Sequence, residues 1–159
     1  MGNPFFNISY GYVECHGNIM SLCNNSNIIK SHSFNSLFYG ATYLKTAPDI
    51  IADEVELYGC LGMFEGCSNL KSIDKIDVKK VGNGGFARMF YKCESLVNIP
   101  SILPVTTLGD NCCYYMFAEC TSLTTAPELT ATELGYSCCD SMFFSCSSLV
   151  KAPTKLPAT

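Results

Sequence analysis

The sequence predicts an α/β solenoid of about five repeats of roughly 26 residues, each with a short parallel strand and a short helical turn. The first observation is a Met-Phe pair that recurs at 63–64, 89–90, 116–117 and 142–143, with Leu-Phe at 37–38. The interval between successive pairs is constant, except that it is slightly longer between 89–90 and 116–117. The second is that other residues keep the same phase. A unit of this length cannot bury its apolar side alone, so the copies are expected to stack.

The residues in phase should form columns through the core, because each coil of a solenoid contacts its neighbours at equivalent positions. The predicted core columns are Phe64, Phe90, Phe117 and Phe143; Cys67, Cys93, Cys120 and Cys146; and Leu44, Leu70, Leu96, Leu123 and Leu149.

Each repeat has three parts. The phrase LTTAPEL (123–129) spaces Leu and Ala for a short parallel strand, and its Pro removes one hydrogen-bond donor near the strand end. Leu-Gly at 108–109 and 134–135, with Val-Gly at 81–82, places a glycine where a turn with positive φ is expected. CDSMFFSC (139–146) spaces its apolar residues at 3, 4 and 7, which predicts a short helical turn.

The repeats indicate two regions. Residues 1–28 form an N-terminal entry or cap segment, and alternation over 8–12 predicts a hairpin or an irregular cap. Residues 29–159 form the solenoid. The chain stops at KLPAT (155–159), just after a repeat's strand, which would expose the last coil. We therefore expect the chain to continue, or this end to pack against another chain, including end-to-end self-association.

Charge and hydropathy exclude several partners. The net charge of −4 and pI near 5.0 argue against a nucleic-acid role. No window approaches the ~20 apolar residues that membrane insertion needs. The N-terminal MGNPFFNISYGY has neither the basic region nor the apolar stretch of a signal peptide.

The 11 cysteines favour a column of buried thiols over a disulfide framework. Equivalent positions hold Ala41, Phe34 or Phe86, which a core accepts and a disulfide does not. In the vicinal pairs we expect Cys112 and Cys138 to point outward and to be the most reactive.

Neither a cofactor nor a metal ion is expected, because the sequence has no C-x2-C pair and His16 with Cys15 makes a weak ligand set. VGNGGFAR (81–88) lacks the spacing of a phosphate-binding loop, and acidic residues fall in different repeat columns. The chain is therefore predicted not to be an enzyme.

One polar column is a candidate ligand-binding surface. It lies two residues after each strand leucine and should point outward from the strand. Its members are Thr46, Ser72, Asn98, Thr125 and Lys151. Simple solubility explains such a column at least as well as ligand binding.

The repeat resembles the leucine-rich repeats of the BspA type, also called the Treponema pallidum type. The resemblance is carried by Cys120, Leu123, Pro127, Leu134-Gly135 and the 143–146 phrase, and it covers residues 15–159. This chain has about three extra residues before Met-Phe, as in a longer-repeat variant. The resemblance implies a right-handed leucine-rich-repeat coil, and such arrays occur in surface proteins of gut Bacteroidales and in their phages.

Three functions remain open. One is a cell-surface or extracellular recognition and adhesion module, part of a longer chain, that binds a host protein or glycan. Another is a phage virion component, such as a tail fibre or appendage, that recognises a bacterial surface or serves as a structural part. The third is a structural spacer whose coils stack end to end.

Overall fold

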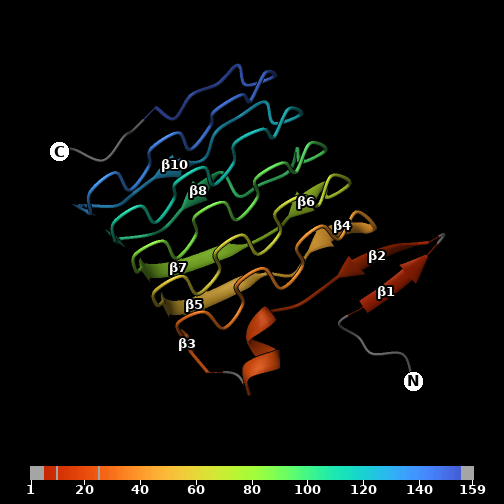
Figure 1. Ribbon diagram of the computed structural model, residues 1–159, viewed down its shortest axis with the longest axis horizontal. Helices are drawn as coiled ribbons and strands as arrows, with labels where there is room; N and C mark the ends of the chain where they lie inside the picture. Colours follow the sequence, from red (N-terminus) through yellow and green to blue (C-terminus); the bar gives the residue numbers. More distant parts are fainter. Residues whose placement is uncertain (1–5, 10, 25, 155–159) are drawn as a thin grey trace.

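The computed structural model describes residues 6–9, 11–24 and 26–154, and it confirms the solenoid. The coils lie one above another, from β3 near the bottom of Figure 1 to β10 near the top. There are about four turns, fewer than the five repeats predicted. The five copies of the motif are separated by four steps, which accounts for the difference. The terminal KLPAT segment, on which we based a prediction, lies outside the described residues.

The longest sheet is parallel and runs through the whole stack. Its strand order is β11-β9-β7-β5-β3. The strands are β3 (Ile28–Ile29), β5 (Ile50–Val55), β7 (Ile76–Val81), β9 (Thr107–Leu108) and β11 (Glu133–Leu134). In β5 and β7 the first, third and sixth residues are buried, so these strands place aliphatic side chains in the core.

Shorter strands complete the strand-bearing side. A four-stranded sheet has the order β1-β2-β4-β6, in which β1 pairs antiparallel with β2 and the other pairs are parallel. The strands are β1 (Phe6–Ser9), β2 (Tyr12–Cys15), β4 (Leu44–Ala47), β6 (Ser72–Ile73), and the separate parallel pair β8 (Ile102–Leu103) and β10 (Glu128–Leu129). The entry segment is thus a hairpin that extends a sheet of the solenoid (Figure 1).

The best-formed strands follow the proline position rather than precede it. Among the described residues, the part of LTTAPEL that precedes the proline forms strands only as β4 and β6, and later copies contribute isolated bridges at Asn98 and at Thr125. By contrast, the β-branched runs IIADEV and IDVKKV make the six-residue strands β5 and β7. In the next coil Pro104, between β8 and β9, divides the equivalent run.

The predicted helical turns are not α-helical. Within the described residues the one helix is the short 3-10 helix η1 (Ile19–Cys23), capped by the Asn18 side chain, which accepts from the Met20 amide at 3.2 Å. The expected helical segments are instead chains of β-turns, which we call the turn segments. They span 31–40, 57–66, 83–92, 110–119 and 136–145.

Backbone hydrogen bonds in the turn segments alternate along the chain. The Leu37 amide closes a turn onto Phe34, whereas the next amide, that of Phe38, donates to Met63 of the following coil at 2.8 Å. The following two amides repeat this pattern. Every second amide therefore holds its own turn and the others join adjacent coils, which satisfies the backbone without a helix.

A four-residue conformational rhythm explains why these segments resemble helices in sequence. Residues with positive φ recur at every fourth position, for example Gly84, Arg88 and Lys92. Side chains four apart then share a face, so Phe86 and Phe90 are both buried. A 3, 4 and 7 spacing is thus common to this ribbon and to an α-helix of 3.6 residues per turn.

The core is a set of stacked columns. The rings of Phe38, Phe64, Phe90, Phe117 and Phe143 are parallel within 7°, with neighbouring centroids 5.3 to 5.7 Å apart. The fully buried members of the predicted columns are Leu44, Leu70, Leu96, Leu123, Cys67, Cys93, Cys120, Phe64, Phe90 and Phe117. In the last coil Phe143, Cys146 and Leu149 are half-buried.

The recurring glycines have a different role from the one predicted. Gly82, Gly109 and Gly135 do not have positive φ. A Cβ atom at Gly109 would lie 2.7 Å from the amide nitrogen of Asn83, and one at Gly135 would lie even closer to that of Asp110. These positions require glycine because the backbones of neighbouring coils meet there.

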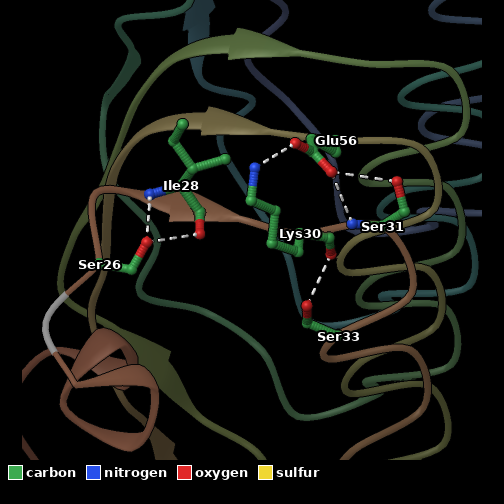
Figure 2. Close-up of polar contacts among 6 residues, drawn as sticks. All are labelled: Ser26, Ile28, Lys30, Ser31, Ser33 and Glu56. Atoms are coloured by element: carbon green, nitrogen blue, oxygen red, sulfur yellow. Dashed lines mark hydrogen bonds and ion pairs between the residues drawn. The ribbon is translucent and has the colours of Figure 1, made fainter.

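Polar contacts join the first turn segment to the second coil (Figure 2). The Glu56 carboxylate accepts from Lys30 Nζ at 2.8 Å and from the Ser31 amide and hydroxyl at 3.0 and 3.2 Å. The Ser33 hydroxyl donates to the Lys30 carbonyl at 2.7 Å. Lys30 and Glu56 occupy the column that holds glycine in later coils. Between the first two coils, side chains at this column therefore make the inter-coil contact.

No helix among the described residues is long and apolar enough to cross a membrane.

Candidate ligand-binding surface

The predicted polar column lies on the strand-bearing side, in two stacked groups. Thr46 pairs with Ser72, and Ser72 forms a bridge to Asn98. Thr125 forms a separate bridge to Lys151. Thr46 and Ser72 are half-buried, and the other three members are exposed. Glu14 of the entry hairpin pairs with Thr46 and lengthens the column by one residue.

A second surface, on the turn-bearing side, is richer in groups that bind ligands. We call it the aromatic patch and define it as Arg88, Tyr91, Tyr114, Tyr115 and Phe144. Tyr115 lies at its centre: its ring centroid is 4.5 Å from that of Tyr114, 5.7 Å from that of Phe144 and 6.0 Å from that of Tyr91. Phe144 is 53% exposed and Tyr114 37%. The patch therefore presents aromatic surface from three successive turn segments.

Charged groups fix the edge of the aromatic patch. Arg88 makes a two-point contact with Glu65, with Nε 3.0 Å from Oε2 and Nη2 2.6 Å from Oε1. The same guanidinium lies 4.5 Å from the centre of the Tyr91 ring. The Tyr91 hydroxyl donates to Glu119 at 2.8 Å, and this hydrogen bond raises the pKa of Tyr91. These contacts fix the orientation of the Tyr91 ring.

Ala118 is the buried member of one column of the aromatic patch. Ala118 occupies the repeat column that holds Tyr91 in the coil before and Phe144 in the coil after. Both neighbours in the column reach solvent, yet Ala118 is fully buried.

Sequence reasoning missed the aromatic patch. Its five members fall in three repeat columns, and each column also holds small or polar residues, such as Ser36 and Ser141 in the column of Tyr115. When each column is considered alone, these small and polar residues hide the aromatic residues of the patch. Comparing several columns in successive coils would have found it, because the contacts of Tyr115 with Tyr91 and Phe144 join different columns of neighbouring coils.

The thiols divide into two kinds. All the cysteines of the described chain are free. In the main column each thiol donates to a phenylalanine carbonyl of an earlier coil, as Cys93 does to Phe64 at 3.1 Å and Cys120 to Phe90 at 3.1 Å. Burial raises the pKa of both thiols. These cysteines pack as small apolar residues.

The prediction that Cys112 and Cys138 point outward is wrong. Cys112 is fully buried and Cys138 is 7% exposed, whereas Cys139 is half-buried. The vicinal residues do not alternate in and out as in a strand, because they lie in a turn segment with a four-residue rhythm.

Other chemistry finds little support in the described residues. They bring no three His, Cys, Asp or Glu side chains into a set that could hold a metal ion. His16 contacts Glu14 at 3.6 Å, and both side chains are about half exposed.

Comparison with known proteins gives no relatives: neither a protein family, a curated protein nor a solved structure matches this chain.

Proposed function

We propose that this protein is a non-enzymatic recognition module that binds a protein or glycan through the turn-bearing side of the solenoid. The observation that carries the proposal is the aromatic patch, in which the exposed rings of Tyr114 and Phe144 both lie against Tyr115. Tyr115 in turn lies against Tyr91, whose ring contacts Arg88 and whose hydroxyl donates to Glu119. Tyrosine and arginine contribute strongly to protein interfaces. The flat faces of aromatic rings also pack well against the apolar faces of sugars, while carboxylates accept from hydroxyl groups.

The stacked architecture supports such a role. The inward columns are nearly constant between coils, whereas the outward columns differ in size and charge, as at Tyr39, Glu65 and Tyr91. A rigid scaffold can therefore carry different recognition surfaces without altering its core. The polar strand column offers a second, hydrogen-bonding surface for the same ligand or another one.

Part of the proposal concerns family and location. The Cys-x-x-Leu, Pro and Met-Phe-x-x-Cys phrases support a variant of the BspA-type leucine-rich repeat, in which β-turns stand where short helices were expected. Such a module would act on a cell surface, or as part of a virion. Both locations suit adhesion, since each requires a stable surface that meets ligands outside the cell.

Binding of the intact chain to glycan and protein arrays tests the proposal. Tyr114→Ala and Phe144→Ala should each lower affinity for the bound ligand at least about tenfold, as expected for central aromatic contacts. Tyr136→Ala is the matched control, because Tyr136 is 80% exposed and outside the patch. Its affinity should stay within about twofold of wild type.

The same arrays separate the two surfaces. Thr125→Ala and Lys151→Ala remove side chains of the strand column and leave the aromatic patch intact. Loss of binding in these variants alone would move the site to the strand-bearing side. If the intact chain binds no glycan or protein, the recognition proposal is wrong.

A further inference from the structure

Four thiols gather in the last two turn segments, at Cys112, Cys113, Cys138 and Cys139. Cys112 Sγ lies 3.7 Å from Cys113 Sγ, and Cys138 Sγ lies 3.8 Å from Cys139 Sγ. The Cys113 amide donates to the Cys138 carbonyl at 2.7 Å, so the two pairs belong to adjacent coils. Unlike the main cysteine column, this cluster places sulfur next to sulfur.

One side of the cluster is accessible. A pocket of about 490 Å³ is lined by Leu134, Ser137, Cys138 and Cys139, among other residues. Cys139 is half-buried, whereas Cys112 and Cys113 are at most 1% exposed. A small solute in this pocket therefore meets Cys138 and Cys139, with the buried thiols of Cys112 and Cys113 behind them.

We propose that Cys139 and Cys113 form a peroxide-reactive dithiol, in which Cys139 attacks the hydroperoxide and Cys113 resolves the product. This inference is independent of the recognition role. In the first step the Cys139 thiolate attacks the distal oxygen of a hydroperoxide, its O–O bond breaks, and an alcohol or water leaves after taking a proton. Cys139 becomes a sulfenic acid and the peroxide is reduced.

In the second step Cys113 attacks the Cys139 sulfur. The S–S bond forms, the S–O bond breaks, and the hydroxyl leaves as water with the proton from Cys113. Two thiols and one hydroperoxide thus give one disulfide, one alcohol or water from the peroxide, and one further water.

The geometry favours Cys113 over Cys138 as the resolving partner. Cys113 and Cys139 are equivalent residues of adjacent coils, and such residues lie about 4.8 Å apart in a parallel stack. That spacing falls within the Cα separation of roughly 4.4–6.8 Å that a disulfide needs. A link between Cys138 and Cys139 would instead have to close across a single peptide unit.

The electrostatics point to Cys139 as the attacking group. A hydrogen bond from the Cys113 thiol, with a second from Cys138, lowers the pKa of Cys139 to about 7. Hydrogen bonds with Cys112 and Cys139, together with burial, raise the pKa of Cys113. Cys139 therefore holds more thiolate near neutral pH, which is the form that reacts with peroxides.

Disulfide mapping of the full reduced chain after treatment with hydrogen peroxide tests the proposal. Trypsin is unsuitable because Lys92 and Lys151 enclose all four cysteines with no basic residue between them. Cleavage at glutamate, after Glu119, Glu128 or Glu133, separates Cys113 from Cys139. We expect a linked pair of peptides joined through Cys113 and Cys139, while Cys93 and Cys120 stay free.

Variants assign the two roles. Cys113→Ser should let the sulfenic acid accumulate at Cys139, where dimedone traps it, and Cys139→Ser should stop disulfide formation. Cys23→Ser is the control, because Cys23 is also half-buried but lies in η1 near the other end of the solenoid. With iodoacetamide at pH 7, Cys139 of the wild type should react roughly fivefold faster than Cys23.

Several results would overturn the proposal. A disulfide between Cys138 and Cys139 would show that Cys113 is not the resolving thiol. Retention of all free thiols under peroxide, or alkylation of Cys139 no faster than that of Cys23, would show that the cluster is not reactive. Circular dichroism checks the fold of each variant, and the wild-type map decides the question if a variant fails to fold.

Discussion

The rings of Phe64 and Phe90, equivalent residues of adjacent repeats, stack with centroids 5.3 Å apart and planes 7° from parallel. Both rings are fully buried. Because each ring contacts its equivalent in both adjacent coils, one phenylalanine stabilises two inter-coil contacts. The stack is therefore the most direct test of the solenoid.

Phe90→Ala should destabilise the protein by about 3–5 kcal/mol, because it leaves a cavity between two coils that cannot close over it. Urea unfolding followed by circular dichroism measures the change. Tyr136→Ala removes a ring that is 80% exposed and should cost less than about 0.5 kcal/mol. Equal losses in the two variants would contradict the stacked core.

Gly109→Ala should destabilise the protein by about 1–3 kcal/mol, because the new methyl group would meet the backbone of Asn83 in the preceding coil. The same unfolding experiment measures it. Thr124→Ala, at an exposed residue, is the control and should have little effect. A neutral Gly109→Ala would mean that adjacent coils are further apart than the structure shows.

Ser145→Ile should cost about 1–2 kcal/mol although the residue is exposed, because φ at Ser145 is 58° and β-branched side chains fit this conformation poorly. Ser145→Asn, which tolerates left-handed backbone, should be near neutral. Thermal unfolding of the pair separates backbone strain from loss of contacts. Similar melting temperatures would argue against the four-residue rhythm at this position.

Glu56→Gln should change how stability depends on acidity. The hydrogen bond from Lys30, with that from the Ser31 amide, lowers the pKa of Glu56 below its usual 4.5. A lowered folded-state pKa gives stability that is present above the unfolded pKa and is lost as pH falls through the folded value. Wild type should therefore be the more stable protein at neutral pH, and its advantage should be lost as the pH falls below 4.5 and through the lowered folded-state pKa of Glu56.

The measurement is the urea midpoint of both proteins across this pH range. Lys30→Met, which removes the larger cause of the shift and keeps the Ser31 contact, should reduce the same advantage in part. A constant difference between wild type and Glu56→Gln at every pH would contradict the assigned contacts.

The sequence was sufficient to predict the solenoid because the repeat period appears as apolar residues at regular intervals. Phe64, Leu70 and their equivalents recur in phase, and burial in the core is what stacking requires of them. The conformation of the turn segments could not be predicted in the same way. A four-residue ribbon and an α-helix bury nearly the same positions, and the backbone hydrogen bonds that distinguish them leave little trace in side-chain pattern.

The surfaces were harder to predict. The column from Thr46 to Lys151 follows from simple alternation along a strand. The aromatic patch depends on contacts between side chains of different columns in neighbouring coils, such as those of Tyr115 with Tyr91 and Phe144. The same limit affected the cysteines. Strand-like alternation placed Cys112 outside, whereas the turn segment buries it.

The alternation of amides in the turn segments also determines where repeats can change length in evolution. One residue inserted there would shift the alternation for every later amide of the segment. Amides that now donate to the next coil would then face their own turn, and the others would face the next coil. The single long repeat avoids this. Its insertion falls between the Ser72–Asn98 bridge, which keeps the usual interval, and the Lys80–Thr107 pair, whose interval is longer by one. Insertions and deletions in such proteins should therefore collect on the strand-bearing side, leaving the opposite face free to vary in side chain alone.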